Sequence, residues 1–205
     1  MYIGSVSRKG LNHLIYEIVD NSVDEHLAGV CDTIRVTLEA DGSCTVEDNG
    51  RGIPVGMHKK GVSAARVVFS TLHAGGKFDN AAYKTSGGLH GVGSSVVNAL
   101  SNWLEVQIFH DGKIYKQRYE RGHTMYPLKE VGKCDINKTG TTVTFSPDGS
   151  IFEETVYDFD TLKQRLRETA FLTKNLRITL RDDREEPVKE RVFPVSYTHL
   201  TLPTT

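Results

Sequence analysis

The chain has 205 residues and a formal net charge of −1 at pH 7, and 38% of its residues are hydrophobic. This composition is typical of a globular protein, and the near-zero charge provides no overall basic field for nucleic acid. The three cysteines form no C-x-x-C pair, which argues against a zinc site or a disulfide framework and favours a reducing, cytoplasmic location. No apolar run approaches the roughly 18 residues of a membrane helix, and the start "MYIGSVSRKG" lacks the apolar core of a signal peptide.

The first half of the chain predicts two helices and a β-hairpin. Residues 11–29 carry apolar side chains at the i, i+3, i+4, i+7 spacing of an amphipathic helix. Residues 34–46 alternate apolar and polar side chains on either side of Asp41–Gly42, which indicates a hairpin. Residues 61–76 predict a second helix. Residues 75–93 are rich in glycine, and we expect this segment to be mobile without a ligand.

The second half of the chain continues the alternation of helices and strands. We expect a helix that ends near Asn102, a hairpin that turns at Asp111–Gly112, a strand over 140–147, a helix over 158–172 that starts near Asp158 or Asp160, and a strand over 176–183. Because the strands arrive as antiparallel hairpins with helices between them, the predicted fold class is α+β. We expect a sandwich in which helices cover one face of a mixed, mostly antiparallel sheet.

Polar side chains line the first predicted helix opposite its apolar face. They are His13, Glu17, Asp20, Asn21 and Asp24, which at about 100° per residue form one narrow stripe. A solvated helix face is the ordinary interpretation of such a stripe. However, the stripe contains no lysine or arginine, and His13 could polarise Glu17, as a general base requires. Asn21 and the acids also offer oxygen ligands that suit Mg²⁺.

Asp48 lies where the second predicted strand ends, at the start of "DNGRGIP". Gly50 and Gly52 would allow a ligand to approach the backbone closely. An ordinary Asp-Asn-Gly turn explains the same residues, and the motif taken alone favours this turn over a ligand site. Asp48 is therefore a candidate only in combination with other segments.

The segment "SGGLHGVGSS" lies directly before a predicted helix. It lacks the G-x-x-x-x-G-K-[ST] pattern of a P-loop, and no strand precedes the incomplete dinucleotide fingerprint that begins at Gly91. Free backbone N–H groups and the dipole at a helix start nevertheless favour a polyphosphate. The alternative interpretation is a flexible loop without a ligand.

Four segments together resemble one ATPase superfamily. They are "EIVDN", "DNGRGIP", "SGGLHGVG" and "TGTTVTF", and they resemble the four nucleotide-site motifs of the GHKL ATPases. That superfamily includes type II topoisomerases, mismatch-repair proteins, a heat-shock chaperone class and histidine kinases. Five longer segments are similar in sequence to the B subunits of DNA gyrase and topoisomerase IV, and this resemblance runs over residues 1–193. They are "MYIG", "YEIVDNSVDEHLAG", "DNGRGIPVGMH", "LHAGGKF" and "YKTSGGLHGVGSSVVNALS". The resemblance implies a GHKL (Bergerat-type) sandwich that binds ATP and hydrolyses it with Mg²⁺.

The resemblance also implies a role for each matching residue. Glu17 would be the general base for the water that attacks the γ-phosphate, His13 would support it, and Asn21 would hold Mg²⁺. Asp48 would accept a hydrogen bond from the adenine amino group, and Thr141 would assist through a water molecule. The remaining implied contacts are Gly52, Ile53 and Pro54 in the base pocket, Tyr83 at the adenine ring, Lys77 at the phosphates, and Gly88, Leu89, His90, Gly91, Val92, Gly93 and Ser94 in a lid over the triphosphate.

Some positions depart from the family pattern. His110 stands where many members carry an arginine at the mouth of the adenine pocket. We expect this chain to lack the N-terminal arm that crosses to the partner subunit, and to lack the transducer domain with its phosphate-binding lysine. Residues 194–205 do not resemble the expected continuation, so this tail is excluded from the predicted domain, which covers 1–193.

The function implied by the resemblance is ATP-driven change of DNA topology by a type II topoisomerase B subunit, either of DNA gyrase or, as the alternative, of topoisomerase IV. A nucleotide-binding module with little turnover and a chaperone-like or kinase-like domain are two further hypotheses. The implied partners in the full-length protein are a second B subunit, the A subunit and double-stranded DNA. This chain alone is expected to be a monomer that binds ATP weakly and does not contact membranes.

Overall fold

The computed structural model of the chain describes residues 5–57, 61–70 and 93–195. In chain order its elements are α1 (Arg8–Leu27), β1 (Thr33–Leu38), β2 (Cys44–Asp48), α2 (Ala64–Ser70), α3 (Gly93–Ala99), β3 (Ser101–His110), β4 (Lys113–Glu120), β5 (His123–Thr124), β6 (Lys129–Lys133), β7 (Gly140–Pro147), α4 (Phe159–Leu172), β8 (Arg177–Asp182) and β9 (Lys189–Phe193). None of the helices in these ranges has the length and apolar character needed to cross a membrane. The predicted end of the second helix and most of the glycine-rich segment lie outside the described residues.

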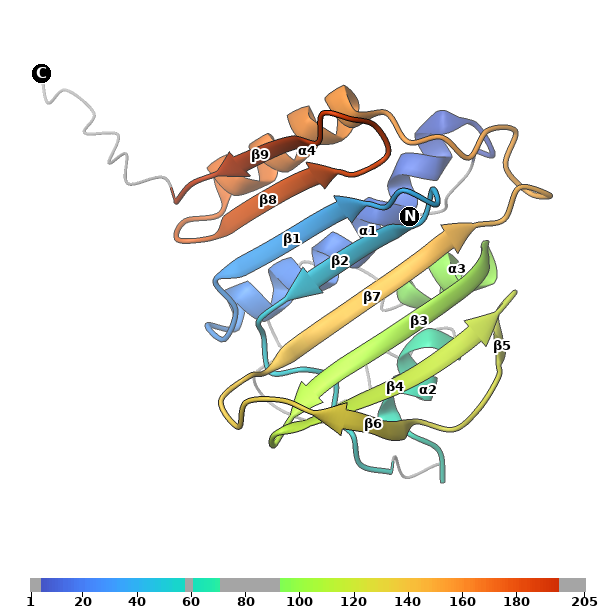
Figure 1. Cartoon of the computed structure of the whole chain (residues 1–205), viewed down its shortest axis with the longest axis vertical. Helices are drawn as coiled ribbons and strands as arrows, with labels where there is room; N and C mark the ends of the chain where they lie inside the picture. Colours follow the sequence, from blue (N-terminus) through green and yellow to red (C-terminus); the bar gives the residue numbers. More distant parts are fainter. Residues whose placement is uncertain (1–4, 58–60, 71–92, 196–205) are drawn as a thin grey trace, which may run out of the picture.

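The strands form one sheet in the order β5–β4–β3–β7–β2–β1–β8–β9, and β6 also pairs with β4. β1 and β8 run parallel, whereas the other pairs are antiparallel. Figure 1 shows β9 at one edge of the sheet and β5 and β6 at the other. The prediction of a mixed, mostly antiparallel sheet is therefore confirmed.

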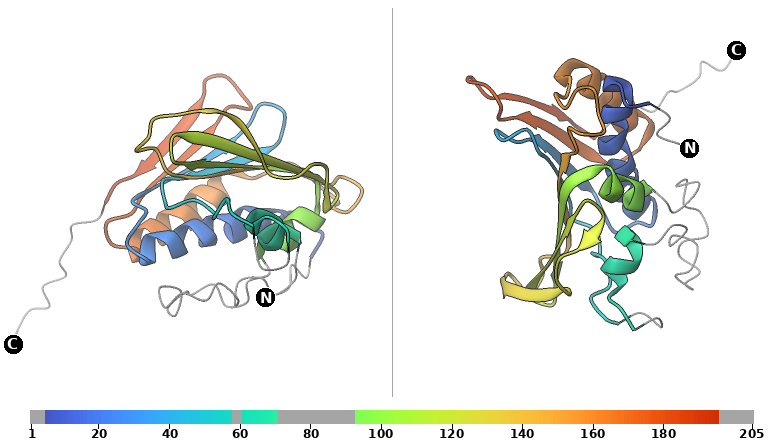
Figure 2. Two further views of the ribbon diagram at one scale, coloured as in Figure 1. Left: turned by 90° about the horizontal axis from the view of Figure 1, so that it is seen from below. Right: turned by 90° about the vertical axis from the view of Figure 1, so that its right-hand side faces the viewer.

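The helices of the described structure cover one face of this sheet. Figure 2 shows α1 and α4 lying along that face, with α2 and α3 near one end of α1. α1 packs against both α3 and β2, and α4 packs against β8 and β9. The predicted α+β sandwich is confirmed, and its second face is left without a helix in the described part of the chain.

The hydrophobic core lies between the helices and the sheet. α1 contributes the apolar residues that the helical spacing identified, and alternate residues of the central strands face them. Buried side chains include Leu14, Ile15, Ile18, Val36, Val46, Leu104, Val106, Phe145 and Leu162. Burial of one such side chain contributes about 1.5–3 kcal/mol. This burial decides which face of each strand points toward α1, and therefore which strand ends lie near the polar stripe of that helix.

Local sequence signals set several boundaries of these elements. Asp111 and Gly112 have φ angles of 49° and 72°, the left-handed pair that joins two strands in a two-residue hairpin turn. Asp158 caps α4 by accepting a hydrogen bond from the backbone N–H of Thr161 at 2.9 Å. Of the two aspartates that the sequence offered as a helix start, the structure thus uses Asp158.

Some elements differ from the sequence prediction. α3 ends at Ala99 and not near Asn102, because Ser101 begins β3 and its hydroxyl donates to the carbonyl of Val97 at 2.6 Å. Strands β5, β6 and β9 are absent from the sequence prediction. β6 and β9 lie at sheet edges and are mostly exposed. Neither of these two strands therefore shows the apolar alternation from which strands are predicted.

Candidate functional site

Within the described residues, four elements bring five of the predicted site residues together around α1. Glu17 and Asn21 lie one turn apart on this helix. Asp48 ends β2, and its register partner is Thr141 near the start of β7. α3 begins at Gly93 and packs against α1. Residues far apart in the chain thus meet along one stretch of a single helix.

The carboxylate of Asp48 is held in one orientation by three hydrogen bonds. Its Oδ2 accepts from the hydroxyl of Ser22 at 2.7 Å, and its Oδ1 accepts from the backbone N–H groups of Gly50 at 3.0 Å and Thr141 at 3.3 Å. Burial raises the pKa of this carboxyl, and the hydrogen bonds act in the opposite direction. A carboxylate has about four acceptor positions, so this group keeps capacity to accept from a ligand N–H.

Sequence reasoning missed two supports of this carboxylate and its loop. Ser22 is 3% exposed and lies on the apolar stripe of α1, four residues after Ile18. A polar side chain on a buried stripe needs a partner, and this was the signal that could have identified Ser22. The second support is Glu25, which pairs with Arg51 through N–O distances of 3.2 and 3.0 Å. This ion pair ties α1 to the loop that follows β2.

The predicted base-pocket residues follow Asp48 in that loop. Gly52 has a φ of 80°, and a Cβ added there would lie 3.1 Å from the carbonyl oxygen of Gly140. A side chain at this position would therefore strain the backbone and crowd the start of β7. Ile53 packs partly buried against the core, whereas Pro54 is exposed.

Glu17 lies directly against the first residue of α3. A Cβ built on Gly93 would overlap Oε2 of Glu17 and would lie 3.2 Å from its carboxyl carbon. Burial raises the pKa of Glu17, and the neighbouring Asp20 raises it further. A carboxyl group with a raised pKa is a stronger base, which suits general base chemistry.

Asn21 is joined to the start of α3 by its side chain. Its Nδ2 donates to Oγ of Ser94 at 2.6 Å, and within the described residues its Oδ1 makes no hydrogen bond. An amide oxygen is a suitable ligand for Mg²⁺, which keeps several waters and takes few protein ligands. No cluster of three His, Cys, Asp or Glu residues that could hold a metal occurs in residues 5–57, 61–70 and 93–195. As a single protein ligand, Oδ1 of Asn21 would therefore fit a Mg²⁺ ion that is held mainly by phosphates and water.

His13 lies one turn before Glu17 but contacts a different neighbour. Its ring meets the ring of Tyr16 nearly edge-on, with centroids 5.6 Å apart and planes at 77°. No hydrogen bond between His13 and Glu17 occurs in the described structure. Burial lowers the pKa of His13, and two nearby cations lower it further. The structure therefore favours a neutral imidazole, and its support of Glu17 stays a prediction.

Several predicted contacts lie outside the described residues, so their roles stay predictions. These are Lys77, Tyr83, Gly88, Leu89, His90, Gly91 and Val92. His110 is described and lies at the end of β3, where its Nε2 is 3.2 Å from a carboxylate oxygen of Asp111. The residue that departs from the family pattern therefore has an acidic neighbour in its own hairpin turn.

Two cavities, of about 690 and 340 Å³, share Thr33 and Arg35 in their linings. Arg35 and Glu47 point to the helix-free face of the sheet, because they alternate with the buried Val36 and Val46. The smaller cavity also reaches Asp48. Both cavities lie across the sheet from Glu17, so the strongest candidate site remains the one along α1.

Residues 6–151 match the family described as histidine kinase-, DNA gyrase B- and HSP90-like ATPase, and the chain belongs to this ATPase family. It is 62% identical over 183 residues to the B subunit of DNA gyrase from Thermotoga maritima. It is 57% identical over 185 residues to the B subunit of DNA topoisomerase 4 from Streptococcus pneumoniae. These matches cover 89% and 90% of this chain but 28% and 29% of the relatives. The chain thus spans less than a third of their length.

The fold agrees with that of a solved relative. The crystal structure of the 43K ATPase domain of Thermus thermophilus gyrase B, in complex with an aminocoumarin, superposes with a TM-score of 0.84 at 43% sequence identity. The superposition covers 95% of this chain and 49% of that chain. The predicted resemblance to the ATPase domains of gyrase and topoisomerase IV B subunits is confirmed, as is the GHKL sandwich.

Proposed function

We propose that this chain is the ATP-binding and ATP-hydrolysing domain of a type II DNA topoisomerase B subunit. The observation that carries the proposal is the arrangement along α1. This helix presents Glu17 to the start of α3, Asn21 to Ser94 one turn later, and Ser22 to Asp48. Neighbouring turns of one helix therefore supply a general base in Glu17 and a metal ligand in Asn21. They also supply Ser22, which orients the carboxylate that recognises the nucleobase.

Asp48 is the residue that selects adenine in this proposal. Three donors of the protein already orient its carboxylate, and its remaining acceptor capacity takes the exocyclic amino group of adenine. Guanine presents a carbonyl oxygen at the same place, and two acceptors repel each other. Thr141 assists through a water molecule, and Gly52, Ile53 and Pro54 line the base.

Glu17 carries out proton transfer in the hydrolysis step. As the water oxygen bonds to the γ-phosphorus and the bond to the bridging oxygen breaks, Glu17 takes the proton of the water, and ADP and phosphate are formed. Mg²⁺, when bound, neutralises charge on the phosphate oxygens. Asn21 would hold this ion through its amide oxygen, and its bond to Ser94 keeps that oxygen oriented.

Glu17→Gln should abolish hydrolysis and leave ATP binding within a few-fold. A positioned general base contributes roughly 10²–10⁴ in rate, and the amide keeps the shape of the side chain. Turnover is measured by phosphate release in a full-length B subunit that carries this domain, and binding by calorimetry on the chain. Glu47→Gln is the matched control, because the same change on the helix-free face should affect neither quantity. Full turnover in Glu17→Gln would remove Glu17 from the mechanism.

The pH dependence of the parent protein provides a second check of the same assignment. The pKa of Glu17 is raised, first by burial and then by Asp20. Its basic form is present above that raised pKa and is lost as the pH falls through it. Turnover should therefore decline at a higher pH than the ordinary pKa of a glutamate would produce.

The activity of the whole protein is also proposed, since the chain spans less than a third of its curated relatives. ATP turnover would drive changes of DNA topology, with a second B subunit, the A subunit and double-stranded DNA as partners. A topoisomerase IV subunit is the alternative to a gyrase subunit. Residues 1–193 would form the ATPase domain and 194–205 a tail outside it, and the chain alone would be a monomer of weak ATP affinity and little turnover. Three free thiols suit a cytoplasmic location.

A further inference from the structure

Helices α1 and α4 lie side by side and are joined near both ends. Figure 2 shows the pair on the same face of the sheet. At the start of α1, Arg8 pairs with Glu154 and lies 3.8 Å from Asp158. At the far end, Nε2 of His26 lies 2.8 Å from the carbonyl oxygen of Lys174. These contacts hold the two helices in a fixed register.

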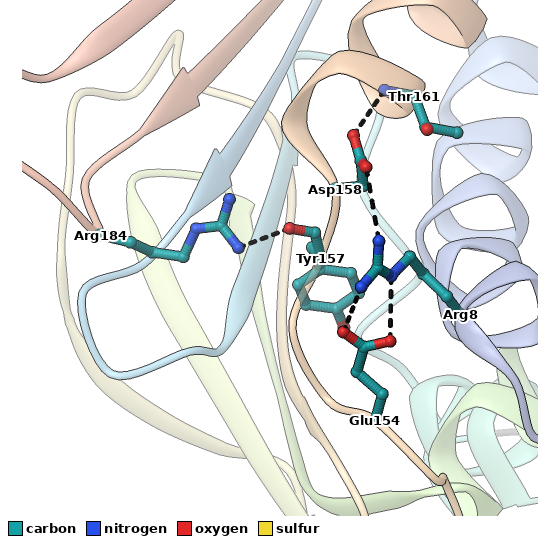
Figure 3. Close-up of polar contacts among 6 residues, drawn as sticks. All are labelled: Arg8, Glu154, Tyr157, Asp158, Thr161 and Arg184. Atoms are coloured by element: carbon teal, nitrogen blue, oxygen red, sulfur yellow. Dashed lines mark hydrogen bonds and ion pairs between the residues drawn. The ribbon is translucent and has the colours of Figure 1, made fainter.

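The first of these contacts is part of the N-terminal cap of α4. Figure 3 shows Asp158 accepting from the backbone N–H of Thr161 with one carboxylate oxygen and turning the other toward Arg8. The carbonyl of the preceding residue, Tyr157, accepts from the guanidinium of Arg184 at 2.7 Å. The start of α4 is therefore anchored both to α1 and to the loop after β8.

Between the two anchors, Arg165 of α4 reaches Tyr16 of α1. The guanidinium carbon of Arg165 lies 5.6 Å from the centroid of the Tyr16 ring, which is within cation–π range. The same ring contacts the imidazole of His13 edge-on, with centroids 5.6 Å apart. A chain of contacts thus runs from α4 to a point one helical turn before Glu17.

Burial and three charged side chains act on the protonation of His13 in the described structure. Burial is the largest influence and lowers the pKa of the imidazole. The cations of Lys9 and Arg165 also lower this pKa, whereas the carboxylate of Asp20 raises it. Lys9 and Asp20 belong to α1 itself. Arg165 is the α4 residue that acts on His13, and it is paired with Glu168 of the same helix at 4.0 Å.

We propose that Arg165 is a positioning residue for ATP hydrolysis, which packs on the ring of Tyr16 and through that ring holds the imidazole of His13 in place one turn from Glu17. This inference rests on the proposed role of Glu17 as the general base. A cationic His13 would stabilise the carboxylate of Glu17 and make it a weaker base. A neutral ring leaves Glu17 able to take the proton of the attacking water.

The test compares Arg165→Gln with Arg167→Gln, the same change at an exposed position of the same helix. The first readout is the titration of His13 in the chain, followed by NMR and assigned with the His13→Gln variant. Arg165→Gln should move the midpoint of this titration to higher pH, because a cation that opposes the imidazolium form is removed. Arg167→Gln should leave the midpoint unchanged.

The second readout is turnover in a full-length B subunit that carries this domain. Arg165→Gln should lower kcat about two- to fivefold near pH 7 and leave the KM for ATP unchanged. The expected change in kcat is small because solvent screens the electrostatic interactions of a half-exposed side chain. Added salt should reduce the difference through screening. Arg165→Lys keeps the charge but not the planar guanidinium, so it should restore the midpoint of the His13 titration.

Two results would overturn this proposal. One is an unchanged His13 midpoint in Arg165→Gln, even if kcat fell, because Arg165 would then act on stability alone. The other is an equal shift in Arg167→Gln, because the effect would then not depend on the contact with Tyr16. The titration does not require hydrolysis. Failure of the proposed function, seen as full turnover in Glu17→Gln, is therefore distinguishable from failure of the Arg165 proposal.

Discussion

Gly93 stands where any side chain would displace the carboxylate of Glu17, because an added Cβ would overlap its Oε2. Gly93→Ala should therefore move the general base away from the position of the attacking water. A misplacement of about 1 Å can cost roughly 100-fold in rate, so we expect kcat to fall about 10- to 100-fold. Phosphate release in a full-length B subunit that carries this domain measures the change.

Gly149→Ala is the control for this substitution. A Cβ added at Gly149 would lie 3.8 Å from Cγ2 of Thr155, which is an ordinary contact. This variant should keep the turnover of the parent. If Gly93→Ala also kept full turnover, Glu17 would have room to move without loss, and the close contact would have no role in catalysis.

At the scale of elements, the capping residue Asp158 secures the position of α4. Its carboxylate satisfies the backbone N–H of Thr161 and faces Arg8 of α1. Asp158→Ala should lower the free energy of unfolding by about 1 kcal/mol, the usual cost of a lost N-cap. Urea denaturation at neutral pH measures this change.

Two further variants separate capping from a general loss of charge. Asp158→Ser retains an N-cap oxygen and should keep most of the stability. Asp160→Ala removes a carboxylate from the exposed first turn of the same helix, and its effect should be smaller than that of Asp158→Ala. Equal losses in Asp158→Ala and Asp160→Ala would show that the cap is not the source of the stability.

At the scale of the whole molecule, nucleotide binding should stabilise the entire domain, because the proposed contacts come from α1, β2, β7 and α3. A ligand at about 100 times its Kd adds about 2.7 kcal/mol to the free energy of unfolding, which corresponds to roughly 5–10 °C in Tm for a chain of this size. ATP with Mg²⁺ should produce this shift in a thermal unfolding experiment, and GTP should not.

Asp48→Asn should reduce the shift with ATP while the chain stays folded, because the amide keeps the shape of the carboxylate but loses its charge. Glu47→Gln, on the opposite face of the same strand, should respond to ATP like the parent. A shift with GTP as large as that with ATP would contradict the assignment of Asp48.

Much of the fold could be predicted because its signals are local. The spacing of apolar residues in α1 and the Asp111–Gly112 turn each follow from a few consecutive residues. The sequence motifs also identified Glu17 and Asp48 as candidate site residues, and their roles stay predictions. The edge strands β6 and β9 could not be predicted, because their residues are mostly exposed and carry no alternation.

By itself, the sequence determined the class of the fold, the family and the candidate polar residues, since these depend on periodicity and on motifs read along the chain. Only the tertiary structure decided which distant segments of the chain come into contact. Examples are the parallel pairing of β1 with β8, the hydrogen bond from Ser22 to Asp48, and the contact of Arg165 with the ring of Tyr16. Such pairs leave no pattern in a local window, because packing of the helices on the sheet brings them together.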